Sequence, residues 1–257
     1  MGDGDPFDEC IERLDCGLFD GIGSQSTVKD KRSWLALQRA VRAAKPSYVY
    51  LEIGSYLGGS LQQYLQDPRC TRIYSIDNRT VDGRHSANSA AAMLANLSAV
   101  APDALDKLTW FDCDAGDLPP DAVREPVDLC FIDGRHTDEA VRSDFSFCLG
   151  VCAPDAVIYF HDAGVTRSGI RACLRTLKRL DRPYVAHKLP GDTFVVGLLQ
   201  SPLTADSRVR ELAVARDGER WLATAAVVKW VSRHAPASLR PAGARLRDRL
   251  WGGRRPS

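Results

Sequence analysis

Hydrophobic and polar positions follow two different periods along the middle of the chain. Short runs rich in β-branched and aromatic residues alternate with segments of about ten or more residues whose apolar positions recur at helical spacing, the pattern of βαβ units around a parallel sheet. The runs predict strands at Tyr48–Ile53, Arg72–Ile76, Leu108–Phe111, Val127–Ile132 and Ala156–Phe160. Helices are predicted between them at Gly59–Gln66, Ser86–Leu97, Thr137–Leu149 and Ser168–Leu180.

The pattern changes on both sides of this region. Two later runs, Tyr184–Lys188 and Thr193–Leu199, are joined by a Leu-Pro-Gly-Asp turn, which predicts an antiparallel hairpin at the end of the sheet. Before the first strand, apolar positions from Trp34 to Ala44 recur at helical spacing and predict a helix that covers the sheet or its site. After the hairpin, residues 208–234 predict a further helix.

Together these elements predict an α/β fold built on one doubly wound, mostly parallel, Rossmann-like sheet. We divide the chain into an N-terminal helical cap over residues 1–45, the α/β domain over residues 46–200, and a helical, basic extension over residues 201–257. A length of 257 residues with 44% hydrophobic residues is sufficient for a large buried core.

Composition narrows the range of partners. The formal net charge of +1 argues against nucleic acid as the main partner. No apolar run approaches the ~18 residues that a membrane span needs, and the acidic N-terminus does not resemble a signal peptide. We therefore expect a cytoplasmic protein. The eight cysteines contain no Cys-x-x-Cys pair and are interpreted as reduced core residues rather than as a zinc site or disulfides.

A basic tail begins at Lys229, with eight Lys or Arg residues and a single acid, Asp248. Leucines interleaved with these arginines predict either a short amphipathic helix in weak contact with anionic lipid, or a solvated tail or contact within a homo-oligomer. The short apolar stripe favours the second interpretation.

The first strand ends in a glycine loop of sequence Gly-Ser-Tyr-Leu-Gly-Gly-Ser, which leads into a helix. Such a loop at the carboxyl end of a strand lets the backbone approach a ligand closely, although glycine turns also serve as plain connections. The loop residues that we expect to contact a cofactor are Gly54, Ser55, Tyr56, Gly58, Gly59 and Ser60.

Asp77 closes the second strand, 23 residues after Gly54. An acid at this position accepts hydrogen bonds from ribose hydroxyls, in binders of NAD and of S-adenosylmethionine (SAM) alike. The loop lacks the G-x-G-x-x-G spacing of dinucleotide enzymes, and Glu52 just before it suits the ammonium group and sulfonium of SAM better than a pyrophosphate. The pattern therefore favours SAM, with Asn78 as a further contact.

Two more acids, Asp112 and Asp114, end the third strand, where a side chain could face the adenine amino group. A solvated acidic loop explains either residue equally well.

These residues resemble the class I SAM-dependent methyltransferases, and within them the small O-methyltransferase-like proteins often found with sugar and natural-product genes. The resemblance covers about Tyr48–Leu199. It rests on four blocks: Leu51–Ser60, Ser75–Asp77, Val127–His136 with Asp144 on the next helix, and Val157–Asp162. It implies a seven-stranded sheet in the order 3-2-1-4-5-7-6 with strand seven antiparallel.

A third group of polar residues follows the fourth and fifth strands. In a parallel sheet Asp133, His161 and Asp162 would gather at the edge that carries the glycine loop, and could hold a divalent cation such as Mg²⁺ or Mn²⁺. In related metal-dependent O-methyltransferases a carboxylate holds the place of His161, so this residue departs from their pattern. Fixing of its turn is the alternative explanation for Asp133, and capping of the following helix is the alternative for His136.

Two chemical routes are open at these residues. A metal at Asp133 would lower the pKa of an acceptor hydroxyl, and without a metal His136 or His161 would act as general base. Either route predicts methyl transfer to a hydroxyl of a small molecule or sugar, with nitrogen as an alternative acceptor atom. A SAM- or nucleoside-binding regulatory protein without activity and an NAD-linked oxidoreductase are the rival hypotheses.

Overall fold

The computed structural model describes residues 5–79 and 89–224. Its strands are β1 (Tyr48–Ile53), β2 (Cys70–Ile76), β3 (Leu108–Phe111), β4 (Val127–Ile132), β5 (Cys152–Phe160), β6 (Tyr184–Lys188) and β7 (Phe194–Leu198). Its α-helices are α1 (Pro6–Arg13), α2 (Val28–Ala44), α3 (Gln62–Gln66), α4 (Ala90–Val100), α5 (Asp138–Val151), α6 (Arg167–Arg179), α7 (Pro202–Ala205) and α8 (Ser207–Leu212). Short 3-10 helices lie at Cys16–Phe19, Pro102–Lys107, Ala115–Asp117 and Pro120–Ala122.

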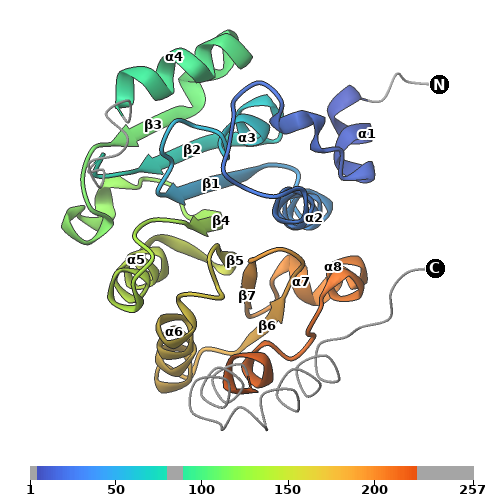
Figure 1. The fold of residues 1–257 in the computed structure, drawn as a ribbon, viewed down its shortest axis with the longest axis vertical. Helices are drawn as coiled ribbons and strands as arrows, with labels where there is room; N and C mark the ends of the chain where they lie inside the picture. Colours follow the sequence, from blue (N-terminus) through green and yellow to red (C-terminus); the bar gives the residue numbers. More distant parts are fainter. Residues whose placement is uncertain (1–4, 80–88, 225–257) are drawn as a thin grey trace, which may run out of the picture.

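The seven strands form one sheet in the order β3-β2-β1-β4-β5-β7-β6 (Figure 1). Strand β7 pairs antiparallel with both β5 and β6, whereas the other pairs are parallel. The predicted order and the predicted hairpin are confirmed. Strands β2 and β5 begin earlier than predicted, and α3 is shorter because residues 57–61 form turns.

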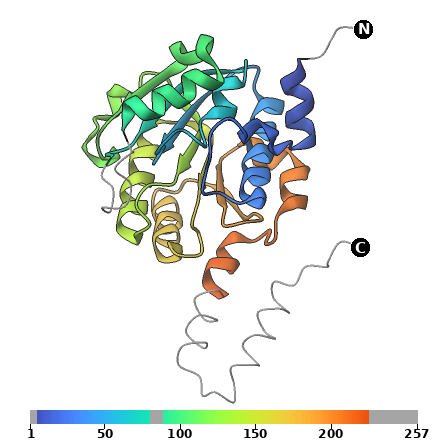
Figure 2. The same cartoon turned by 45° about the horizontal axis from the view of Figure 1, so that its top comes forward.

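Helices cover both faces of the sheet, so the central strands are buried on both sides (Figure 2). Along β1 alternate side chains point to opposite faces: Val49, Leu51 and Ile53 pack in the core beneath α5 and α6, and Tyr48 and Tyr50 pack in the core beneath α1 to α4. Helices α7 and α8 complete the second face beside α2.

Helix α2 is the N-terminal helix predicted from its apolar spacing, and it lies directly on the sheet. Trp34 is fully buried, and its indole Nε1–H donates to the Thr193 hydroxyl at 3.0 Å. At the other end of α2 the Arg42 guanidinium bonds both Asp8 of α1 and the buried Asp67 that follows α3. The N-terminal region is thus anchored at both ends of this helix.

The continuous helix predicted over residues 208–234 is wrong in the described part of the chain. Helix α8 ends at Leu212, and a second helical segment begins at residue 218. Between them Val214 and Ala215 exchange backbone hydrogen bonds with Lys188 of β6. Strand β6 is an edge of the sheet, so its free backbone groups compete with helix formation for these residues. The basic tail from Lys229 onward lies outside the described residues.

None of the described helices is long and apolar enough to cross a lipid bilayer.

Candidate functional site

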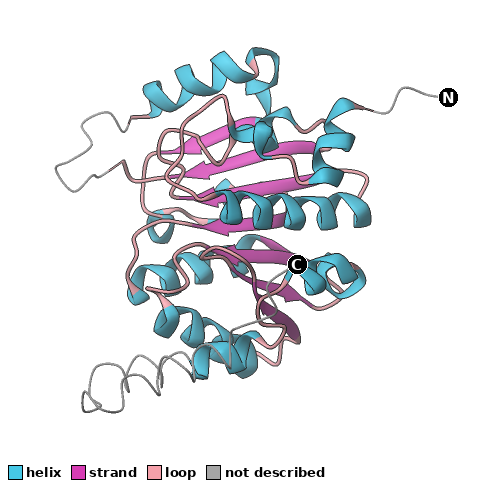
Figure 3. Cartoon of the chain, turned by 45° about the vertical axis from the view of Figure 1, so that its right-hand side comes forward, coloured by secondary structure: helices cyan, strands magenta, loops and turns pink. Residues whose placement is uncertain are grey.

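The candidate site lies where the parallel strands end, at the edge of the sheet where the connecting loops gather (Figure 3). Residues just beyond each strand continue its hydrogen bonding: Asp133 N–H donates to Ile53 O at 2.9 Å, and His161 N–H donates to Ile132 O at 3.1 Å. Gly54, Asp133 and His161 therefore follow three neighbouring strands side by side. The order of the chain reverses between β1 and β4, and ligands of doubly wound sheets bind at such a point.

Among the residues that the structure describes in the loops of this edge, three other than glycine adopt left-handed backbone conformations. Tyr56 has a φ of 45°, Arg79 of 55° and Asp162 of 48°, and they follow β1, β2 and β5 respectively. Such conformations cost about 1–3 kcal/mol each and are concentrated at functional sites. The site is thus held in a conformation that the local sequence alone would not choose.

Gly54 is required by close backbone contact. Its φ is +93°, and a Cβ atom built on it would lie 2.2 Å from the carbonyl oxygen of Asp133. No side chain fits there without separating β1 from the turn after β4.

Replacing Gly54 by alanine is expected to lower the free energy of unfolding by about 2–4 kcal/mol, because the new methyl group must displace backbone. Urea unfolding of the variant measures this loss. Gly23→Ala is the matched control, since a Cβ there would meet no heavy atom within 4 Å. Equal stability of the two variants would contradict the role given to Gly54.

Asp77 joins the glycine loop to the turn after β2. One carboxylate oxygen accepts from Tyr56 N–H at 2.7 Å, and the other accepts from Arg79 N–H at 2.8 Å. Its side chain keeps 11% of its surface exposed. Arg79 Nη1 also lies 3.7 Å from one of its oxygens. A carboxylate offers about four lone-pair directions, so the two backbone bonds do not use its full capacity to accept from a ligand hydroxyl.

The acids after β3 bind neighbouring loops. Asp112 accepts from Arg79 Nε at 3.0 Å, and Asp114 accepts from Asn78 at 2.8 Å and from Arg135 at 3.1 Å. Asn78, Asp112 and Asp114 therefore meet beside Asp77, as the prediction of a common binding region requires. Contact of any of them with adenine stays a prediction.

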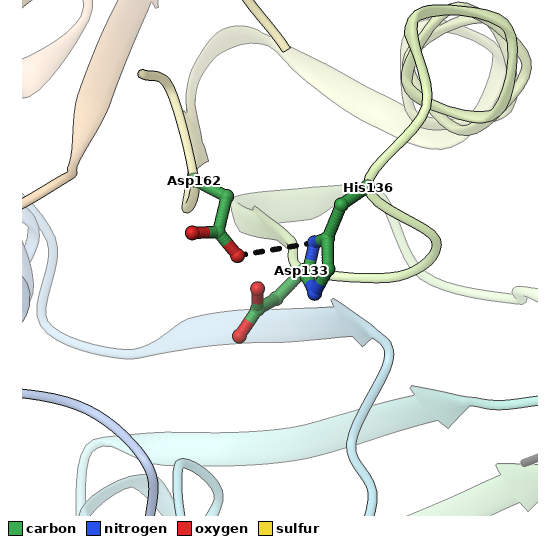
Figure 4. Close-up of side chains that lie close together, drawn as sticks. All are labelled: Asp133, His136 and Asp162. Carbon is green, nitrogen blue, oxygen red and sulfur yellow. Dashed lines mark ion pairs between the residues drawn. The ribbon is translucent and has the colours of Figure 1, made fainter. Parts of the chain in front are cut away.

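A cluster of three side chains lies where β4 and β5 end (Figure 4). Asp133, His136 and Asp162 each place one possible ligand atom within 4.8 Å of the others. His136 Nδ1 lies 3.1 Å from an Asp162 oxygen, and its ring is 55% exposed. Burial raises the pKa of Asp133, which the nearby His161 and His136 oppose. Two carboxylates and an imidazole form a mixed oxygen and nitrogen donor set.

Known proteins resemble the chain mainly in its central part. Residues 51–163 match the family model described as a methyltransferase domain. No curated protein matches the chain in sequence. Residues 51–163 therefore resemble methyltransferase domains in sequence.

The chain also resembles solved structures. A Klebsiella pneumoniae protein assigned to the O-methyltransferases superposes with a TM-score of 0.51 at 16% identity, covering 77% of this chain and 92% of its own. The Bacillus cereus O-methyltransferase, in complex with SAH, and TomG from Streptomyces achromogenes, in complex with SAM, each give 0.49 over the same shares of the chains, at 15% and 19% identity. At such identity the first likeness shows the fold alone, which is the class I methyltransferase fold.

Glu52 lies elsewhere than its predicted role requires. Its side chain is fully buried and accepts hydrogen bonds from the hydroxyls of Tyr50, at 2.7 Å, and Ser60. Burial raises the pKa of Glu52 to about 8, against the opposing hydrogen bonds. Glu52 thus lies inside the core, because the alternation along β1 places it on the same buried face of the sheet as Tyr48 and Tyr50.

His161 lies between two carboxylates, and its roles as base and metal ligand stay predictions. Its Nδ1 lies 3.1 Å from Asp133, and its Nε2 lies 3.6 Å from Asp30 at the start of α2. Burial would lower its pKa, but the hydrogen bonds to Asp133 and Asp30 raise it to about 10. Both ring nitrogens of His161 thus face carboxylates, which favours the protonated imidazole. His136 is the histidine that lies in the three-residue cluster with Asp133 and Asp162.

Asp30 is the site residue that the sequence analysis missed. Thr27 and Asp30 form a capping box, a signal that the Thr-x-x-Asp spacing does carry. That signal identifies the start of a helix, and the contact with His161 depends on tertiary packing that no local pattern contains.

Proposed function

We propose that the chain is a SAM-dependent methyltransferase that methylates a hydroxyl of a small molecule or sugar. The observation that carries the proposal is the resemblance to methyltransferase domains of residues 51–163, whose glycine loop and Asp77 meet at the point where the strand order reverses.

The residues of this edge fit SAM. Gly54 lets the glycine loop pack against the turn after β4, and the partly exposed Asp77 carboxylate beside that loop can accept hydrogen bonds from ribose hydroxyls. When bound, SAM supplies an electrophilic methyl group on its sulfonium. The protein then has to bring an acceptor oxygen in line with that methyl group and remove its proton.

His136 is the group that takes the proton. Asp162 holds its Nδ1 at 3.1 Å, which orients the exposed ring and leaves Nε2 to accept the proton of the acceptor hydroxyl. Asp162 also stabilises the positive charge that the ring gains. Asp133 adds a second carboxylate on the same side of the ring.

The same three residues fit a divalent cation. Asp133, His136 and Asp162 would hold it, and the imidazole favours manganese over magnesium. Such a cation supplies positive charge that lowers the pKa of the acceptor hydroxyl. In that case the proton passes to water or to a carboxylate, because the imidazole is occupied.

Calorimetric titration of the EDTA-treated protein with SAM and with SAH tests the cofactor. We expect micromolar binding by the wild type and about 100-fold weaker binding by Asp77→Ala, because hydrogen bonds to a charged group are lost. Asp121→Ala, at an exposed acid, is the control. A wild type that binds neither ligand would overturn the proposal, and preference for NAD would support the oxidoreductase alternative.

A further inference from the structure

The first turns of α2 close one side of the proposed site. Asp30 is 3% exposed, and its Oδ2 accepts from the backbone N–H of Thr27 at 3.1 Å and from its hydroxyl at 2.5 Å. Its Oδ1 accepts from Asp192 N–H at 2.6 Å in the turn between β6 and β7. The Asp30 carboxylate is therefore fixed by the helix cap on one oxygen and by the hairpin on the other.

The same Oδ1 faces His161. It lies 3.6 Å from Nε2, while Nδ1 on the opposite side of the ring lies 3.1 Å from an oxygen of Asp133. Trp34, one turn further along α2, packs edge-on against the ring with centroids 5.5 Å apart. The imidazole thus spans the gap between α2 and the residue that ends β4, with little freedom to rotate.

A second connection runs through the hairpin. The backbone N–H of Asp192 donates to Asp30. The side-chain carboxylate of Asp192 accepts a hydrogen bond from Gly164 N–H at 2.8 Å, and its backbone carbonyl oxygen accepts one from Ala163 N–H at 3.1 Å. These two residues directly follow Asp162. Asp30 is consequently linked to Asp133 through His161, and to the loop of Asp162 through Asp192.

The hairpin turn is shaped to permit this contact. Gly191 has a φ of +72°, and a Cβ atom on it would lie 2.0 Å from Asp30 Oδ1. Ser33 adds a hydrogen bond from its hydroxyl to Pro190 O at 2.9 Å. The backbone of the hairpin turn thus packs directly against the Asp30 side chain of helix α2.

We propose that Asp30 is a positioning residue of the methyl-transfer site. It touches neither SAM nor acceptor. It holds the His161 ring so that Nδ1–H donates to Asp133, and thereby fixes the Asp133 oxygens that face His136 and Asp162. This inference rests on the proposed function for its purpose, but the positioning itself can be measured without turnover.

Nuclear magnetic resonance of the imidazole rings in the full chain provides the test. In the wild type the His161 Hδ1 proton, assigned by its absence in His161→Gln, should give a downfield signal protected by the bond to Asp133. Asp30→Ala should abolish this signal and shift the ring resonances of His136. Asp30→Asn retains an oxygen acceptor for Nε2–H and should restore both.

Thr27→Ala is the matched control, because it weakens the cap of α2 and leaves the contact between Asp30 and His161 in place. If Asp30→Ala keeps the Hδ1 signal, or shifts His136 no more than Thr27→Ala does, the inference is overturned. Titration of the same samples with SAM separates the two proposals: a wild type that shows no response to SAM contradicts the proposed function, while the imidazole signals still decide the role of Asp30.

Discussion

Replacing His136 by glutamine is expected to lower the rate of methyl transfer about 10²- to 10⁴-fold, the usual contribution of a positioned general base, and to leave SAM affinity unchanged. The Asp162 carboxylate 3.1 Å away orients the ring, and the ring is exposed enough to reach an acceptor. Glutamine retains a donor for Asp162 but cannot accept a proton. The measurement is formation of SAH from SAM with a panel of sugar and phenolic acceptors.

His187→Gln is the control for this substitution. His187 is a histidine of β6 whose Nδ1 bonds Arg216 O at 2.7 Å, away from the cluster, and a glutamine amide can replace that bond. Full activity of His136→Gln would refute the assignment. If its rate falls and Mn²⁺ binding measured by electron paramagnetic resonance falls with it, His136 acts as a metal ligand, and a fall in rate alone identifies the base.

The Glu52→Gln variant is expected to be more stable than the wild type at pH 8, by as much as about 4 kcal/mol. The pKa of Glu52 is raised from 4.5 to about 8, primarily by burial. Above pH 4.5 the unfolded chain releases this proton while the folded protein retains it, so the wild type loses stability as pH rises from 4.5 to 8. Glutamine cannot ionise and avoids this loss.

Urea unfolding of both proteins at several pH values measures the difference, which should vanish near pH 4.5. Glu139→Gln, at an exposed acid of α5, should show no such pH dependence. A Glu52→Gln variant that is less stable by the same amount at every pH would show that Glu52 is ionised in the folded protein and required as an anion.

Much of the fold was predictable because its signals are local. The apolar runs of β1 and β4 gave their bounds without change, since strands buried on both faces need such runs. The segment after α8 was not predictable, because Ala215 is held by the edge of β6, a contact between distant parts of the chain.

The location of the site could be predicted from the sequence, but the contacts between its side chains could be predicted only in part. Strand order brings Gly54, Asp77 and Asp133 to one edge whatever their rotamers, so their proximity follows from sequence and topology. Which histidine joins Asp133 depends on where each ring points. The contact between His161 and Asp30 was not predictable, because nothing near His161 in sequence reveals the carboxylate that reaches it from α2.

The segment that matches the family model is shorter than the set of residues that forms the proposed site. The family match spans residues 51–163, but Asp30 and Gly191 meet outside it on either side. A chimera that transplants residues 51–163 into another methyltransferase would carry His161 without Asp30, which lies on helix α2. Recombination between proteins of this fold must therefore exchange helix α2, residues 51–163 and the hairpin turn together. Segments chosen by sequence similarity alone would be mismatched where α2 and the turn meet His161.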